Sequence, residues 1–284
     1  MNRSVVQYIK FWLAQSAVTW PIAILILPIF TIVYVSFTGE NGTFSLKYYF
    51  HFLDYVYTQV IGRSFFLAFS TMLGTLLLGY PIAYYVALCS KRYKLLLLLL
   101  LTLPFWTNFI VQVYAWFFIL EKYGLLSQLL LYLNIIKEPI HFAYNIWAVL
   151  AIMIYCYLPF AIMPMYSSFE KVDIRLLDAS MDLGATRWQT FFNITLPLTL
   201  SGIKTGALLV FVPAFGEFVI PTLLGGSKYL TAGALLSYYY IETYDIKHGA
   251  TFTVLVGCSL LLSVLFINQL FNILHKHNKG LTHE

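Results

Sequence analysis

Residues 178–197 read DASMDLGATRWQTFFNITLP and differ from the apolar runs on either side. The stretch mixes charged, small and apolar residues, a composition that neither a buried core nor an irregular loop requires. Asp178 and Asp182 are four residues apart, so both would lie on one face of a helix. Pro197 closes the stretch and would prevent a straight continuation. The pattern predicts a short helix at a membrane surface, followed by a bend and a link into an apolar span.

Small residues are frequent in the first half of this stretch. Ala179, Ser180 and Gly184 have short side chains, which let a second surface approach a helix backbone closely. A short helix joined firmly to the next span is suited to act as a lever, because a push on it would move the span. The residues leave one alternative open, namely an amphipathic loop helix without a partner.

The composition indicates that the main solvent of the chain is lipid. Of 284 residues, 60% are hydrophobic and only 10% are charged, which is too few charges for the surface of a soluble domain. The net charge of +5 would suit a nucleic-acid partner, but the basic residues gather at the ends of apolar runs instead of among aromatic residues. The chain is therefore expected to be a membrane protein that does not bind nucleic acid.

Six apolar stretches are long enough to cross a hydrocarbon core, which needs about 20 helical residues. The expected spans are residues 18–37, 65–88, 95–120, 146–166, 204–224 and 252–274. They predict an all-α membrane protein with six transmembrane helices in a single domain, residues 1–284. Four prolines fall inside these spans: Pro104, Pro159, Pro164 and Pro213. Kinks at these prolines could surround a cavity or could serve packing alone.

The loops between spans carry a second set of expectations. Phe44–Gly62 alternates aromatic and polar residues and predicts a short amphipathic helix at the outer interface, and Leu125–Leu133 resembles it. The apolar run near the N-terminus is long enough to remain in the membrane, so it is not expected to be a cleaved signal.

The basic residues predict the orientation in the membrane. If both termini are cytoplasmic, eleven of the 17 lysines and arginines lie in inner segments and six in outer segments. The inner set is Arg3, Lys10, Lys91, Arg92, Lys94, Lys171, Arg175, Arg187, Lys204, Lys276 and Lys279. The outer set is Lys47, Arg63, Lys122, Lys137, Lys228 and Lys247. Because cytoplasmic loops are the richer in basic residues, we expect a multi-pass protein of the bacterial inner membrane with residues 175–197 in the cytoplasm.

Motifs of soluble enzymes are absent from the sequence. It contains no GxxxxGK[ST], HExxH, GxSxG or GxGxxG pattern, and its six histidines are scattered. Cys89, Cys156 and Cys258 form no CxxC or Cys/His cluster, so neither a disulfide framework nor a metal site is expected. The chain is expected to be no enzyme and to carry no cofactor.

Residues 178–197 resemble the signature cytoplasmic loop of ABC importer permeases, in which Glu-Ala-Ala is followed at fixed spacing by Gly and by Ile-x-Leu-Pro. The matching positions are Asp178, Ala179, Ser180, Gly184, Ile194, Leu196 and Pro197. Aspartate stands where the family has glutamate, and Ser180 stands for the second alanine, so charge or size is kept. The resemblance implies a type I importer (MetI-like) permease fold whose coupling helix docks on an ATPase subunit. ATP-driven closure of the ATPases would then reorient the spans.

The resemblance extends from the first span to the C-terminus. The chain is similar to the PotB-like permease subunits of bacterial spermidine/putrescine importers. The segments that carry this likeness are Leu78–Pro81, Leu103–Thr107, Val113–Trp116, Tyr157–Phe160, Met163–Tyr166, Val212–Pro221 and Leu223–Gly226. The family implies two copies of an ATPase subunit and a periplasmic polyamine-binding protein as partners. A second permease is expected because one six-helix chain would enclose only half of a path.

A polyamine is a flexible cation, and a path for it should combine carboxylates, aromatic faces and amide oxygens. Glu217 lies thirteen residues after Lys204, about 20 Å along a helix and thus within the outer half of the bilayer. If the fifth helix instead begins near Pro197, Glu217 would reach the outer interface and be solvated.

Polar and aromatic residues of the third and fourth spans are further candidates for this path. They are Trp106, Asn108, Gln112, Tyr114, Trp116 and Tyr155. Asn108, Gln112 and Trp116 recur every four residues and so share one helix face. Interhelical hydrogen bonds and lipid anchoring are the alternative roles.

The sequence thus predicts a permease that forms half of a polyamine path and hydrolyses no ATP itself. An importer of iron, sulfate or thiamine would use the same machinery and remains an alternative. An intramembrane enzyme or a channel that works without an ATPase is the other.

Overall fold

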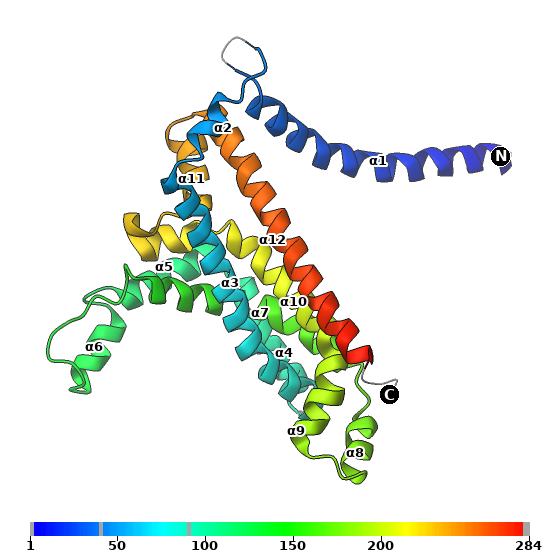
Figure 1. Ribbon diagram of the computed structural model, residues 1–284. Coiled ribbons are helices and arrows are strands. Elements are labelled where there is room, and N and C mark those ends of the chain that lie inside the picture. Colours follow the sequence, from blue (N-terminus) through cyan, green and yellow to red (C-terminus); the bar gives the residue numbers. More distant parts are fainter. Residues whose placement is uncertain (1–2, 40–41, 90–91, 281–284) are drawn as a thin grey trace. The chain divides into compact units, whose positions relative to one another are not determined.

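The computed structural model describes residues 3–39, 42–89 and 92–280, and these residues are almost entirely helical (Figure 1). In the labels used here, η marks a short 3-10 or π turn. The elements are α1 (Arg3–Ser36), α2 (Lys47–His51), α3 (Tyr55–Tyr84), η1 (Tyr85–Cys89), α4 (Lys94–Thr102), η2 (Leu103–Trp106), α5 (Phe109–Leu120), α6 (Leu125–Tyr132), α7 (Ile146–Phe169), α8 (Ile174–Asp182), α9 (Arg187–Thr190), η3 (Phe191–Thr195), α10 (Leu196–Phe215), η4 (Pro221–Gly225), η5 (Gly226–Tyr229), α11 (Ala232–Ser237), η6 (Tyr238–Glu242) and α12 (Ile246–Gly280).

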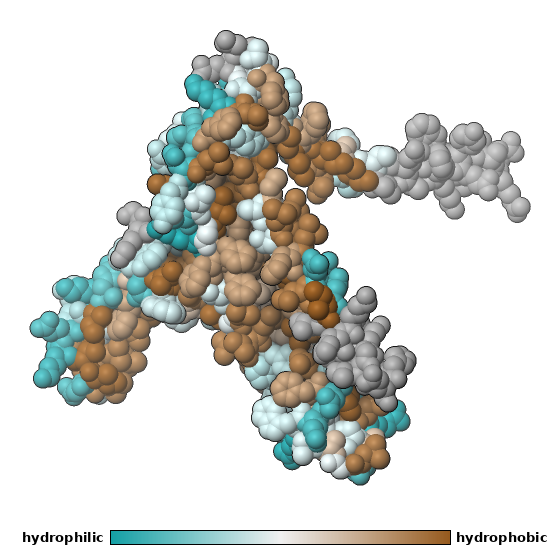
Figure 2. All heavy atoms as spheres, in the orientation of Figure 1, coloured by the Kyte–Doolittle hydropathy of each residue, from teal (hydrophilic) through white to brown (hydrophobic). Residues whose placement is uncertain are grey.

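Six helical stretches of the described chain are long and apolar enough to cross a membrane. They are Thr19–Ser36, Tyr55–Leu88, Phe109–Tyr132, Ile146–Phe169, Arg187–Phe215 and Ile246–Ile273. The predicted all-α fold with six spans is therefore confirmed. Apolar side chains dominate the middle of these helices, whereas the region of α8 and α9 mixes hydrophilic and hydrophobic side chains (Figure 2).

Contacts within the chain define two units. The first comprises residues 1–58 and 236–258, and the second comprises residues 59–235 and 259–284. In the first unit, only 6% of the Thr19–Ser36 stretch of α1 is buried within this chain. The expected interfacial helix over 44–62 is only α2, because Tyr55 already begins the long helix α3. Thus the amphipathic segment continues directly into the second span. The similar stretch Leu125–Leu133 is helical over α6, and its place at the interface stays a prediction.

The expected span over residues 95–120 is divided in the second unit. A helix and a 3-10 turn cover Lys94–Trp106, and α5 begins only at Phe109. Pro104 has no amide hydrogen to donate and favours the end of the first helix. The Asn108 side chain then accepts a hydrogen bond from the Ile110 amide at 2.9 Å and caps α5.

Close packing of α7 against α10 forms the core of the second unit. A Cβ atom on Gly202 would lie 2.7 Å from the Pro164 carbonyl oxygen, and one on Gly206 would lie 3.0 Å from that of Ala161. These glycines are four residues apart and share one helix face, which lets the two backbones meet. Phe169 of α7 and Phe211 of α10 are fully buried. The packed helices α7 and α10 therefore hold both ends of the segment that contains α8 and α9.

Candidate functional site

The helix α8 begins with a side-chain cap. Asp173 precedes it and accepts a hydrogen bond from the Arg175 amide at 3.0 Å, and the two side chains form an ion pair at 2.8 Å. The hydrogen bonds of the Arg175 guanidinium and amide lower the pKa of the Asp173 carboxyl. A carboxylate at a helix N-terminus also interacts favourably with the helix dipole. Arg175 is thus engaged by Asp173.

The helix α8 ends in a Schellman turn built on Gly184. The Gly184 amide donates to the Met181 carbonyl at 2.9 Å, and the Ala185 amide donates to the Ser180 carbonyl at 3.1 Å. Gly184 has φ +89°, a conformation that residues with a Cβ adopt only with strain. Its ideal Cβ position meets no atom within 4 Å. The glycine is therefore suited to this backbone conformation, and the close approach of a partner expected from its small size stays a prediction.

The helix α9 is tied to α8 by a hydroxyl pair. Thr186 and Gln189 form a capping box, with the Gln189 side-chain oxygen accepting from the Thr186 amide at 2.7 Å. The Ser180 and Thr190 hydroxyl oxygens are 2.6 Å apart and share a hydrogen bond. Thr190 is buried. The serine that replaces the family's alanine thus links the surface helix to the start of the following span.

A π turn joins α9 to α10 without a break. The Leu196 amide donates to the Phe191 carbonyl, five residues earlier. The hydrogen bond over η3 therefore spans one residue more than in an α-helix. Pro197 lies in the first turn of α10, where its ring would crowd a normal helical carbonyl four residues before it. The widened turn accommodates the proline. The expected bend is therefore a π turn within one helical stretch, and the predicted fifth span starts earlier than residue 204.

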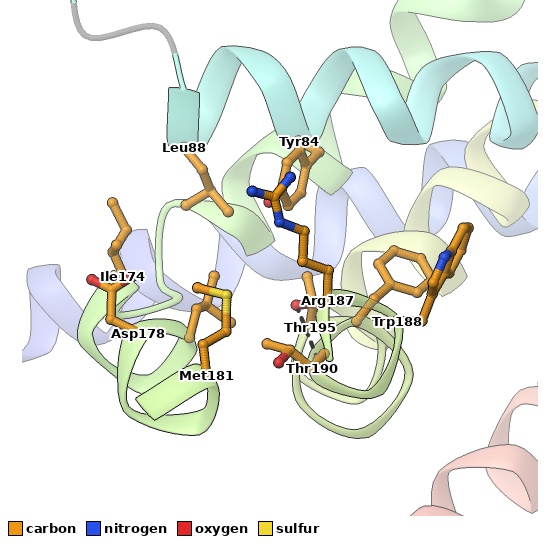
Figure 3. Close-up of a pocket in the computed structure, with 11 residues that line it drawn as sticks. Tyr84, Leu88, Ile174, Asp178, Met181, Arg187, Trp188, Thr190 and Thr195 are labelled. Carbon is orange, nitrogen blue, oxygen red and sulfur yellow. Dashed lines mark hydrogen bonds between the residues drawn. The ribbon is translucent and has the colours of Figure 1, made fainter. Parts of the chain in front are cut away.

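The two short helices line an open cavity of about 590 Å³ together with η3, the end of α3 and η1 (Figure 3). Asp178 and Met181 of α8 lie on one side of it, and Arg187 and Thr190 of α9 lie on the other. Asp178 and Ala179 are exposed, as a docking face requires.

Large apolar side chains are exposed on the same segment. Leu183 is 90% exposed and Trp188 is 73% exposed, and Trp188 stacks on the exposed ring of Phe192. Monomeric proteins seldom expose such side chains together in water. The last three family positions, Ile194, Leu196 and Pro197, are instead half-buried at the root of α10. The segment thus has an exposed end and an anchored end.

The link from α7 to this segment carries an ion pair. Lys94 Nζ lies 2.8 Å from Glu170 Oε1, and the Tyr166 hydroxyl donates to the same oxygen at 2.5 Å. The hydrogen bonds from Lys94 and Tyr166 lower the pKa of Glu170. The contact joins the first residue of α4 to the end of α7.

Glu217 lies just beyond the end of α10, where the helix breaks. It is 9% exposed, and it is the only charged side chain among the described residues that is buried. One carboxylate oxygen accepts from the Val219 amide at 2.9 Å and the Ile220 amide at 3.3 Å. The other accepts from the Tyr157 hydroxyl at 2.6 Å. The carboxylate therefore caps the next helical turns and connects them to α7.

The structure corrects the first placement of Glu217 and part of the second. The helix does not start at residue 204, so Glu217 is not thirteen residues into it; α10 begins at Leu196 and ends at Phe215. The alternative start near Pro197 is therefore confirmed, but the solvated side chain that it implied is buried within this chain. The residues at the end of α10 pack against α7 and cover the carboxylate. The helical periodicity of the sequence does not predict this contact.

The other path candidates fall into three groups. Gln112 donates to the Pro104 carbonyl at 2.5 Å and to the Thr107 hydroxyl, so with Asn108 it stabilises the break in the third span. Trp116 packs edge-on against Tyr155, with ring centroids 5.2 Å apart. Trp106 and Tyr114 form the third group, with 87% and 44% of their surfaces exposed. Contact of these residues with a substrate remains a prediction.

Sequence reasoning missed Tyr157 and Thr190 as functional candidates. Tyr157 lies in Tyr157–Phe160, one of the segments that carry the family likeness. Its phenol was the available signal, because a buried tyrosine hydroxyl usually has a hydrogen-bond partner. Thr190 had no local signal, because its partner Ser180 belongs to another helix.

Comparison with known proteins agrees with this architecture. Residues 76–279 match the family described as binding-protein-dependent transport system inner membrane component. The chain is 38% identical over 255 residues to the spermidine/putrescine transport system permease protein PotB of Escherichia coli (strain K12), an alignment covering 86% of this chain and 93% of that protein.

Two solved structures share the fold. A bacterial ABC transporter involved in the import of the acidic polysaccharide alginate matches with a TM-score of 0.76 at 15% identity, covering 95% of this chain and 99% of the other. The bacterial alginate ABC transporter in complex with an alginate pentasaccharide-bound periplasmic protein matches with a TM-score of 0.73 at 16% identity, covering 95% and 96%. By its sequence and its six apolar helices, this chain belongs to the binding-protein-dependent transport system inner membrane components, the permease subunits of ABC importers.

Proposed function

We propose that this chain is the permease subunit of an ATP-driven polyamine importer and forms half of the path for spermidine or putrescine. The observation that carries the proposal is the 38% identity over 93% of the Escherichia coli spermidine/putrescine permease. ATP hydrolysis then belongs to two ATPase subunits, a second permease completes the path, and a periplasmic polyamine-binding protein delivers the substrate.

The proposed orientation has both termini in the cytoplasm. It follows from the distribution of lysine and arginine, eleven in inner and six in outer segments. Lys91, part of the short basic link between the second and third spans, lies outside the described residues. With this orientation, α8 and α9 face the cytoplasm, where an ATPase is available.

The proposed coupling surface consists of α8, Leu183 and the exposed face of α9. In the cytoplasm, Leu183 and Trp188 would face water unless a partner covers them, and an ATPase groove would bury them. A displacement of α8 would pass to α9 through the Ser180–Thr190 hydrogen bond. Since the π turn joins α9 to α10, the displacement would continue into the membrane.

The proposed cation path includes Glu217, Trp116 and Tyr155. Glu217 is buried without an ion-pair partner among the described residues, and an ionisable group inside a membrane protein commonly marks an ion or substrate pathway. An ammonium group near Glu217 would supply the missing positive charge. The Trp116–Tyr155 pair offers aromatic faces of the kind that attract cations.

Reconstitution tests the proposed function. The chain would be co-purified with its second permease and ATPase, placed in proteoliposomes, and supplied with binding protein, ATP and radiolabelled spermidine or putrescine. We expect ATP-dependent accumulation that unlabelled polyamine abolishes and that sulfate, ferric iron and thiamine leave unchanged. Transport that these solutes inhibit, or that proceeds in vesicles lacking the ATPase, would contradict the proposal.

A further inference from the structure

A second cavity lies in the unit formed by residues 1–58 and 236–258, away from the coupling segment in the sequence. Its volume is about 540 Å³. The residues that line it are Lys47, Tyr48, His51, Asp245, Lys247 and His248. They come from α2 and from the start of α12, two segments about 200 residues apart in the chain.

The charge of this basic cavity is unbalanced. Two lysines and two histidines face a single carboxylate, that of Asp245. That carboxylate is already occupied, because it accepts from the His248 amide at 3.1 Å and lies 2.7 Å from His248 Nδ1. Among the described residues, neither Lys47 nor Lys247 forms an ion pair. The cavity therefore presents ammonium groups that lack an anionic partner.

Aromatic packing holds the walls of the basic cavity in place. The rings of Tyr48 and His248 meet edge to face at 4.9 Å, and the Lys247 ammonium lies 6.0 Å from the centre of the Tyr48 ring. His51 Nε2 is 2.8 Å from the Tyr57 hydroxyl. The site is thus pre-organised, which lowers the entropic cost of binding a charged group.

The positive charge of the basic cavity disfavours the polyamine as its occupant and favours an acidic group. A polyamine would be repelled by two ammonium groups, whereas a carboxylate would gain charge-assisted hydrogen bonds from them. In the proposed orientation, α2 and the start of α12 both belong to outer segments, where the binding protein arrives.

We propose that this cavity anchors the binding protein by receiving an aspartate or glutamate side chain from its surface. The inference rests on the proposed function and names a contact that joins the two proteins. Charge complementarity would place the binding protein over the path and keep the cationic substrate away from the anchor.

The test uses the complete complex in nanodiscs. The measured quantity is the binding-protein concentration that half-saturates stimulation of the ATPase in the presence of spermidine. We expect Lys47→Gln with Lys247→Gln to raise this concentration by about 10-fold or more. Lys122→Gln is the matched control, since this outer lysine also lies over a tyrosine but is outside the cavity, and it should leave the value unchanged.

Carbodiimide cross-linking identifies the contact directly, because it joins a lysine amine to an adjacent carboxylate. We expect an amide between Lys47 or Lys247 and an acidic residue of the binding protein. The double Lys→Arg variant should keep the affinity and lose the cross-link. A change smaller than about 2-fold in the Gln variant, or cross-links only elsewhere, would overturn the anchor.

Two further outcomes would also overturn it. If the Gln effect disappears in nanodiscs made without anionic lipid, the occupant is a lipid headgroup and not a protein carboxylate. If the wild-type complex is not stimulated by polyamine-loaded binding protein, the proposed function fails and the anchor fails with it. A stimulated wild type with an unaffected Gln variant rejects the anchor alone.

Discussion

The conformation of one residue, Gly184, determines how α8 ends and how α9 can begin beside it. Its φ of +89° is disfavoured for residues with a Cβ, while the space around it is open. We expect Gly184→Ala to destabilise the α8–α9 turn by about 1 kcal/mol and to weaken ATPase retention during purification of the complex.

Gly184→Asn separates backbone strain from lost space at this position. Asparagine tolerates positive φ better than alanine, so this larger residue should retain more ATPase and more uptake than Gly184→Ala. If retention instead falls with side-chain size, in the order Gly, Ala, Asn, then a partner occupies the space beside Gly184 and the backbone explanation is wrong.

The carboxylate of Glu217 combines a structural role with a charge. Glu217→Gln keeps an oxygen that can accept from the Val219 and Ile220 amides but removes the charge. We expect assembly to be normal and polyamine uptake to fall by about 10-fold or more, as measured in proteoliposomes.

Tyr157→Phe is the companion variant, because it removes the 2.6 Å hydrogen bond and leaves the carboxylate in place. Its uptake should fall less than that of Glu217→Gln if the charge contacts the substrate. Full uptake by a correctly assembled Glu217→Gln complex would show that the residue is a helix cap and no part of the path.

Among the elements, the α7–α10 pair depends on glycines that allow the backbones to meet. A Cβ on Gly202 would clash with Ser168 Oγ and would lie 2.7 Å from the Pro164 carbonyl oxygen. Ser168 can rotate, but the carbonyl belongs to the backbone. Gly202→Ala should therefore destabilise the permease by about 1–3 kcal/mol and lower its thermal unfolding midpoint in detergent.

Gly257→Ala in α12 is a matched control for this packing prediction. Its Cβ would meet no atom within 4 Å, so the helix propensity of alanine should leave stability unchanged or slightly raised. Equal midpoints for the two variants would show that the contact at Gly202 does not limit stability.

On the scale of the whole molecule, the ion pair between Lys94 and Glu170 connects segments 76 residues apart. The hydrogen bond from Lys94 is the main cause of the lowered pKa of Glu170, whose ordinary value is 4.5. A lowered pKa in the folded state means that the stabilisation is fully present above pH 4.5 and is lost as the pH falls through the folded value.

We therefore expect the thermal stability of the permease to lose the contribution of this pair only below about pH 4.5. Lys94→Gln should remove a stabilisation of about 0.2–1 kcal/mol at pH 7, since both side chains are partly exposed. The unfolding midpoint of the variant should also fall less steeply than that of the wild type below about pH 4.5. Thermal unfolding of both proteins from about pH 3.5 to about pH 8 provides the comparison. If the unfolding midpoints of variant and wild type fall equally at low pH, the ion pair is not the cause of the acid destabilisation.

The sequence by itself determined the lipid solvent, the number of spans and the presence of a short helix ahead of Pro197. These features depend on composition and on short-range chemistry: apolar runs of sufficient length, and charged residues at helical spacing. The family likeness rests on residues 178–197 and on segments of the spans, and the family match over residues 76–279 agrees with it.

Only the tertiary structure decided the partner of Glu217, the Ser180–Thr190 bond and the basic cavity between α2 and α12. Each joins residues from separate helices, and the Tyr157–Glu217 bond spans 60 positions. In lipid almost every face of a span is apolar, so periodicity does not reveal which face meets which neighbour. That choice depends on backbone approach at glycines such as Gly202 and Gly206, and it becomes visible only when the helices are packed.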